Sequence, residues 1–156
     1  MEPQKEMNRS ADKGLQINSP QSAFSFFKTR LVADVEEFWV AALNSNKDVI
    51  EASCIFRGTV DCCPVHPREI FRFAYIHNAS SIVLGHNHPS GTAEPSVEDH
   101  TTTKQLLNAA EILQIPIVDH LIVAGERYFS FSMKGLLPSE QVSCFAHSGR
   151  SQRGEK

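Results

Sequence analysis

The chain has 156 residues and a nearly balanced charge, with 15 lysines and arginines against 18 aspartates and glutamates. This length suits one domain with a sizeable core, and the charge gives no support for broad nucleic-acid binding, which a strong basic excess would indicate. The sequence lacks the run of about eighteen apolar residues that a membrane-spanning helix needs, and its polar N-terminus has no apolar signal region. We therefore expect a cytoplasmic protein without a membrane partner.

The N-terminal part of the chain predicts a tail followed by a helix. Residues 1–18 show no apolar periodicity, which predicts a disordered tail. Ser19 and Pro20 then have the signature of a helix start, a serine cap followed by proline at the first helical position. Large apolar side chains recur at helical spacing after them, so we expect a helix over residues 20–33 that packs on the core.

The rest of the chain alternates strands and helices. Short apolar runs bounded by turn residues predict strands, and longer runs with apolar residues three and four apart predict helices. In chain order, the expected elements are strands over 38–43 and 49–59 joined by a turn at 44–48, a helix over 67–77, a strand over 82–84, a helix over 96–114, and strands over 117–124 and 127–132. This order predicts an α/β architecture with a mixed sheet and flanking helices. The domain is expected over residues 19–137, followed by a flexible tail over 138–156.

The helix expected over residues 96–114 has a predicted inner face. Its apolar side chains recur at the spacing of one helix side. The residues expected to point inward are Leu106, Leu107, Ala110 and Leu113.

The stretch from His86 to Asp99 carries the most chemistry. His86 and His88 stand one residue apart after an apolar run, and residues i and i+2 of an extended chain point to the same face, so both rings can aim at one ion. A turn is expected at residues 89–91, where proline and glycine occur, and Asp99 then adds a carboxylate. Two imidazoles and one carboxylate leave a fourth tetrahedral position open, which is typical of a catalytic rather than a structural zinc site. The alternative is a polar loop that binds no metal.

Ser96 allows two compatible interpretations. It stands where a helix N-cap belongs, with Asp99 three residues later as the acid of a capping box. Its hydroxyl could also help to hold an oxyanion beside a metal-activated water. The sequence leaves both roles open.

Three other polar residues could support this site. One, Asn87, lies within the stretch itself, and two lie in the strand expected over residues 117–124. Asn87 is expected to point away from the flanking histidines and to brace the loop. Asp119 and His120 could orient a metal ligand from behind, or could form a buried polar pair that fixes the strand. We favour the structural interpretation for this pair.

The pattern His86-x-His88, seven residues, Ser96-x-x-Asp99 resembles the JAMM signature of the JAB/MPN metallopeptidase family, and HNHPSG resembles its RadC branch. The segments PREIFRFAYIHNAS and DHLIVAG also resemble RadC proteins, so the resemblance runs from about Glu36 to Leu137. It implies a JAB/MPN fold similar to cytidine deaminases, a zinc ion (Zn²⁺) held by the two histidines and the aspartate, and a glutamate that acts on the bound water. It further implies hydrolysis of a peptide or isopeptide bond in a protein or peptide substrate. The resemblance does not identify the substrate of the RadC branch.

The general base is expected to be a glutamate that is not itself a metal ligand. Aligning the chain with the E-x-F-W pattern of RadC proteins selects Glu36, followed by Phe38 and Trp39. Glu37 would point to the opposite face of the strand. We therefore expect Glu36, with Glu37 as the alternative.

Other functions compete with hydrolysis of peptide bonds. The letters HNH also name a nuclease class, but there the three residues are spread through a ββα-metal element, and a metal-dependent nuclease stays an alternative. A zinc deaminase is not expected, because its H-x-E and P-C-x-x-C patterns are absent. RadC proteins are commonly connected with DNA repair, so a DNA-repair-associated binding or scaffold protein is the non-enzymatic alternative. The sequence does not indicate the oligomeric state.

Overall fold

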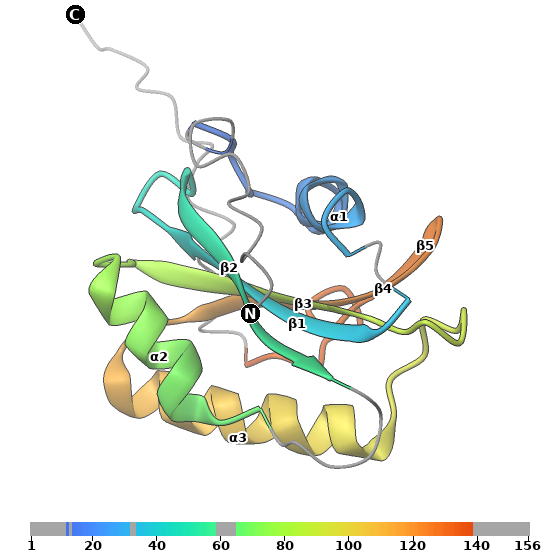
Figure 1. Cartoon of the computed structure of the whole chain (residues 1–156). Helices are drawn as coiled ribbons and strands as arrows, with labels where there is room; N and C mark the ends of the chain where they lie inside the picture. The colour runs from blue at the N-terminus through green and yellow to red at the C-terminus, as the bar shows by residue number, and fades with distance from the viewer. Residues whose placement is uncertain (1–11, 13, 32–33, 59–64, 139–156) are drawn as a thin grey trace, which may run out of the picture.

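The computed structural model describes residues 12, 14–31, 34–58 and 65–138, and within them a sheet is covered by helices on both faces (Figure 1). The elements in chain order are α1 (Pro20–Lys28), β1 (Glu36–Leu43), β2 (Val49–Gly58), α2 (Pro67–Ile76), β3 (Ser81–Asn87), α3 (Val97–Leu113), β4 (Ile117–Ala124) and β5 (Arg127–Ser130). The predicted α/β order is confirmed. None of the described helices has the length and apolar character that crossing a bilayer requires.

The five strands form one mixed sheet, as predicted, and their order in the sheet is β2-β1-β3-β4-β5. β3 and β4 run parallel, and every other neighbouring pair runs antiparallel. β3 and β4 are buried along their whole length, as parallel strands covered on both faces usually are. Phe38 of β1 pairs with His86 of β3. Because these strands are antiparallel, the start of β1 and the end of β3 meet at one end of the sheet.

The helices divide the core into two layers, with α1 on one face of the sheet and α2 and α3 on the other (Figure 1). Side chains alternate along a strand, so β1 contributes to both layers. Trp39 and Leu43 pack in the layer of α1, whereas Phe38 and Val40 pack in the layer of α2 and α3. Glu36 precedes Phe38 by two residues, and the same alternation therefore places it on the α2 and α3 side.

The prediction that residues 1–18 form a disordered tail is wrong for the end of this segment. Ile17 is only 1% exposed and belongs to the core beside α1. Its backbone N–H donates to the carbonyl of Lys47, which fixes this segment along the turn between β1 and β2. The first eleven residues, and most of the tail predicted over residues 138–156, lie outside the described part of the chain.

α1 is shorter than the predicted helix over residues 20–33. It ends at Lys28. Arg30 then folds back over the Phe26 ring, 3.6 Å from its centroid, and donates a hydrogen bond to the Phe26 carbonyl. Because this bond satisfies a carbonyl of the last turn, the chain can leave the helix while Leu31 stays buried.

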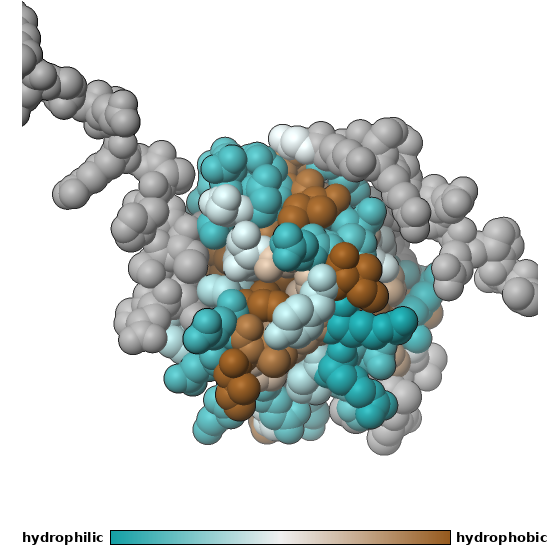
Figure 2. Space-filling view, turned by 90° about the vertical axis from the view of Figure 1, so that its left-hand side faces the viewer, coloured by the Kyte–Doolittle hydropathy of each residue, from teal (hydrophilic) through white to brown (hydrophobic). Residues whose placement is uncertain are grey.

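The C-terminal ends of α2 and α3 leave apolar side chains exposed. Leu113, which was predicted to face inward, is 36% exposed, whereas Ile115 lies in the core instead. The change follows from Gln114, whose left-handed φ of 54° ends the helix and redirects the chain. Ile76 and Ile112 are also mostly exposed. Hydrophobic side chains accordingly gather among hydrophilic ones on the face that Figure 2 shows.

Gly85 of β3 lies directly against the Phe27 ring of α1. A Cβ atom at this position would lie 2.8 Å from atoms of the Phe27 ring, which is fully buried. Since a packed ring cannot move away without disturbing its neighbours, we expect Gly85→Ala to lower the free energy of unfolding by about 1–3 kcal/mol. Urea denaturation of the purified variant measures this loss.

A second substitution tests whether the Phe27 ring is the cause of that loss. Phe27→Leu removes the ring, so the double variant Gly85→Ala/Phe27→Leu is expected to lose less stability than the two single losses added together. Additive losses would contradict the proposed clash.

Candidate metal centre

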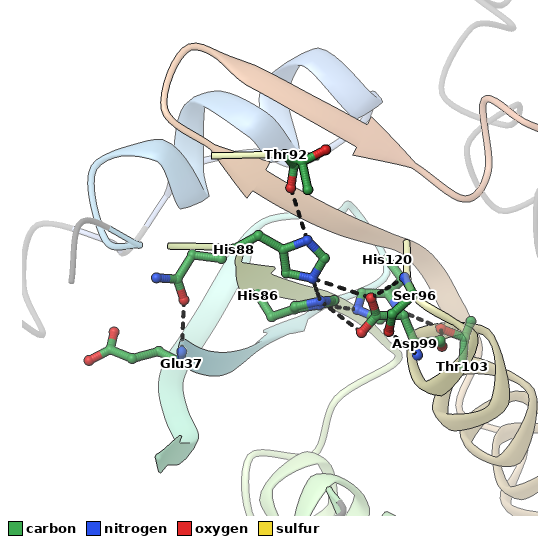
Figure 3. A network of polar contacts seen from close by, with 9 residues as sticks. Glu37, His86, His88, Thr92, Ser96, Asp99, Thr103 and His120 are labelled. Carbon is green, nitrogen blue, oxygen red and sulfur yellow. Dashed lines mark hydrogen bonds and ion pairs between the residues drawn. The ribbon is translucent and has the colours of Figure 1, made fainter. Parts of the chain in front are cut away.

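Four side chains predicted from the sequence meet at the end of the sheet where β1 starts and β3 ends. His86 lies in β3, His88 follows that strand directly, Asp99 lies in the first turn of α3, and Glu36 is the first residue of β1. One ligand atom from each of the four lies within 4.8 Å of the others. Figure 3 shows the two imidazole rings and the Asp99 carboxylate turned toward one another. The four residues form a group that could hold a metal ion.

The closest three of these side chains have the spacing of a metal coordination shell. His86 Nε2 lies 3.1 Å from His88 Nε2 and 3.1 Å from Asp99 Oδ1. His88 Nε2 lies 3.2 Å from Asp99 Oδ2. Ligands at about 2.0–2.1 Å from a tetrahedral zinc ion stand about 3.3 Å apart. The three side chains are therefore already arranged at about the separation that one bound ion would impose.

The loop after β3 fixes the ring of His88. The turn predicted at residues 89–91 is present, with Gly91 N–H donating to the His88 carbonyl and a φ of 88° at Gly91. This turn brings the Thr92 carbonyl to 2.9 Å from His88 Nδ1 (Figure 3). A carbonyl only accepts hydrogen bonds, so Nδ1 carries a proton, and in the neutral ring Nε2 is left with a lone pair directed at the other ligands.

His86 is held from behind by His120 of β4. His86 Nδ1 lies 2.9 Å from His120 Nε2, and His120 Nδ1 lies 2.7 Å from the Thr103 hydroxyl of α3. His120 thus contacts a candidate ligand, as the alternative interpretation of Asp119 and His120 expects. The contacts of Asp119 agree with the favoured structural interpretation, because its carboxylate accepts bonds from the Ser130 hydroxyl and the His120 N–H.

Thr103 was not singled out in the sequence. The available signal is its spacing, because it stands four residues after Asp99 and therefore on the same side of α3 one turn later. Its contact with His120 could not be read from that spacing, since it depends on how α3 packs against β4.

The ionisable groups of the site change one another's pKa values. Burial would raise the pKa of Asp99, but its contacts with the His86 and His88 rings, which stabilise the ionised carboxylate when these rings are protonated, outweigh burial and hold that pKa well below its usual range. Asp99 in turn stabilises the protonated form of His88, which raises the pKa of His88. Burial lowers the pKa of His120 well below its ordinary value, which keeps this ring neutral. The site thus combines the ionised carboxylate of Asp99 with the neutral ring of His120, which contacts His86.

Glu36 and Glu37 lie on opposite faces of β1. Glu36 belongs to the group of potential ligands, whereas the Glu37 side chain points away from it (Figure 3). The Glu37 carboxylate accepts a hydrogen bond of 3.0 Å from Trp39 Nε1 and lies 3.4 Å from Arg57 Nε. Of the two glutamates left open by the sequence, only Glu36 therefore faces the candidate metal centre.

Asn87 holds the backbone on both sides of Glu36. It is buried, its Oδ1 accepts the Glu37 N–H at 2.7 Å, and its Nδ2 donates to the Val35 carbonyl at 2.9 Å. These bonds tie the start of β1 to the end of β3 beyond the last backbone pair. The expectation that Asn87 braces this region is in keeping with these contacts, and the segment it braces is the one that carries Glu36.

We expect Asn87→Ala to lower the free energy of unfolding by about 1–3 kcal/mol, because it leaves buried backbone groups unsatisfied. Chemical denaturation monitored by circular dichroism measures the loss. Asn44→Ala is the matched control: the Asn44 side chain likewise makes two hydrogen bonds to the backbone, accepting the N–H groups of Asn46 and Asp48, but in a turn where water can replace it. An equal loss in both variants would contradict the role given to Asn87.

Ser96 forms the predicted capping box. Its hydroxyl accepts the Asp99 N–H at 3.1 Å, and Asp99 Oδ2 accepts the Ser96 N–H at 2.7 Å. The box aims the Asp99 carboxylate toward the histidines, so helix capping and ligand placement depend on the same contacts. The Ser96 hydroxyl acts as the acceptor in this bond, and its own proton can still be donated.

Comparison with known proteins agrees with this arrangement. The family model of the RadC-like JAB domain matches residues 17–136. The chain belongs to the RadC-like JAB domain family. The RadC resemblance drawn from the histidine motif is thereby confirmed.

The curated relatives of this RadC-like domain extend the same result. A UPF0758 protein of Xanthomonas euvesicatoria pathovar vesicatoria is 36% identical over 135 residues, which cover 86% of this chain and 60% of the relative. A UPF0758 protein of Symbiobacterium thermophilum is 39% identical over 120 residues, covering 76% of this chain and 51% of the relative. The RadC-like chain thus spans between about half and three fifths of the length of these relatives.

Proposed function

We propose that this RadC-like protein is a zinc-dependent hydrolase that cleaves peptide or isopeptide bonds in a protein or peptide substrate. The observation that carries the proposal is the convergence of His86 Nε2, His88 Nε2 and the Asp99 carboxylate at 3.1–3.2 Å, with the Glu36 carboxylate beside them. Membership of the JAB domain family supports the same reaction class.

The donor set fits a divalent transition metal. With Nδ1 of His88 protonated by its contact to Thr92, the inward-facing nitrogen is an electron-pair donor, and Asp99 adds a negative charge. Lone pairs packed this closely repel one another unless a cation lies between them. Imidazole nitrogen and carboxylate oxygen suit zinc, and three protein ligands leave a position for water or substrate.

Bound Zn²⁺ would supply a Lewis acid that brings the pKa of water to about 7. The residues of the chain supply the proton transfers. The Glu36 carboxylate accepts the proton of the water that attacks the amide carbon, and it returns this proton to the leaving amine as the C–N bond breaks. The Ser96 hydroxyl can donate a hydrogen bond to the carbonyl oxygen as negative charge develops there.

The proposal is tested by metal analysis followed by a substrate screen. Protein purified without chelators is expected to contain about one zinc per chain. The loaded protein, with chelator-treated protein as the control, is then offered an internally quenched peptide library and lysine-linked isopeptides. Amine release that depends on the metal supports the proposal. Absence of stoichiometric metal would favour a binding scaffold, and metal-dependent cleavage of nucleic acid alone would favour the nuclease alternative.

A further inference from the structure

A closed chain of hydrogen bonds runs behind the candidate metal centre. His86 Nδ1 contacts His120 Nε2 at 2.9 Å, and His120 Nδ1 contacts the Thr103 hydroxyl at 2.7 Å. The Thr103 hydroxyl also donates to the Asp99 carbonyl at 2.7 Å. The chain therefore starts at one candidate ligand and returns to the backbone of another (Figure 3). It joins β3, β4 and α3.

The acceptor at the end of this chain fixes the direction of every proton in it. The Asp99 carbonyl can only accept, so the single hydroxyl proton of Thr103 is committed to it. The Thr103 oxygen must then accept from His120, which places the ring proton of His120 on Nδ1. A neutral His120 has its lone pair on Nε2 and accepts from His86 Nδ1–H. His86 Nε2 is left unprotonated, facing His88 and Asp99.

We propose that Thr103 and His120 are positioning residues that hold His86 in the tautomer able to bind a metal. The inference rests on the metal site proposed above. Without the Thr103 hydroxyl, the His120 Nδ1–H would lose its acceptor. The ring would then favour the other tautomer, donate from Nε2 to His86 Nδ1, and so drive the His86 proton onto the nitrogen that faces the ligands.

The surroundings of His120 keep its ring in place. The residue is 0% exposed, and Phe131 stacks on the ring at 5.0 Å between centroids with an interplanar angle of 10°. The His120 backbone is held on both sides, because its N–H donates to the Asp119 carboxylate and its carbonyl accepts the Phe131 N–H. Thr103 is also buried. Since water has little access to either residue, it cannot readily replace the missing bond in a variant.

The test compares Thr103→Val with Thr103→Ser. Valine has the shape of threonine but no hydroxyl, whereas serine restores the hydroxyl. Long-range ¹H–¹⁵N correlation spectra of the metal-free protein at about pH 8, above the ordinary histidine pKa of about 6.5, identify which nitrogen of His86 carries the proton. Competition with a chromophoric chelator measures the affinity for Zn²⁺.

We expect wild type and Thr103→Ser to carry the His86 proton on Nδ1 and to bind zinc equally. Thr103→Val is expected to carry the proton on Nε2 and to bind zinc about tenfold more weakly. Thr101→Val is the matched control, because the Thr101 hydroxyl also bonds the carbonyl four residues before it but is exposed on α3. It is expected to behave as wild type.

A folded Thr103→Val with the wild-type spectrum and zinc affinity would overturn the inference. If that variant does not fold, His120→Gln and His120→Leu decide. The glutamine amide oxygen can accept from His86 Nδ1–H, so this variant is expected to keep most of the affinity, while leucine loses about 100-fold. Equal affinities in these two variants would overturn the inference. Failure of wild type to bind zinc would contradict the proposed function, but the spectra of metal-free protein would still report the His86 tautomer.

Discussion

Replacing His88 or Asp99 by alanine is expected to remove the bound metal from the purified protein. Each substitution deletes one of three side chains whose imidazole nitrogens and carboxylate oxygens approach one another to 3.1–3.2 Å. Loss of an outer-shell partner typically weakens metal binding by about 10–100-fold, so loss of a ligand itself should cost more than about 100-fold. Elemental mass spectrometry of wild type and both variants measures the metal per chain.

His100→Ala is the matched control for this measurement. His100 directly follows Asp99 on α3 but is exposed, and its ring contacts Phe131 rather than the ligand group. It is therefore expected to keep the wild-type metal content. Full metal content in His88→Ala or Asp99→Ala, or equal loss in His100→Ala, would contradict the assignment of the ligands.

The ligand group was predictable because short-range geometry determines most of it. His86 and His88 share a face through the alternation of an extended chain, and their strand was recognisable from the apolar run before them. Asp99 is held by a capping box within three residues, a pattern readable from the sequence. In such segments local preference and tertiary contact require the same conformation, so the pattern predicts the position of the side chain.

The contacts behind the ligands could not be predicted in this way. His120 reaches His86 only because β4 pairs in parallel with β3, and Thr103 reaches His120 only because α3 packs against β4. Both contacts join elements whose relative placement is set by the whole core. The burial of Ile17 was missed for a similar reason, because a single apolar residue in a polar segment has no periodicity.

Replacing Glu36 by glutamine is expected to slow hydrolysis strongly while leaving the metal in place. The Glu36 carboxylate faces the ligand group, and Asn87 fixes the backbone on either side of it. Glutamine keeps the size of the side chain but cannot accept a proton from water. Since a positioned general base typically contributes about 10²–10⁴-fold to the rate, kcat should fall by that factor on whichever substrate the screen identifies.

Glu37→Gln is the matched control, because it makes the same chemical change one residue away on the opposite face of β1. The amide oxygen of glutamine can still accept the Trp39 Nε1–H bond. The lost ion pair with Arg57, whose side chain is 63% exposed, should matter little. We therefore expect Glu37→Gln to retain wild-type kcat and metal content. If Glu36→Gln hydrolysed substrate at the wild-type rate, the proton would be carried by another group. If only Glu37→Gln lost activity, Glu37 and not Glu36 would be the general base, and the assignment made from the two faces of β1 would be wrong.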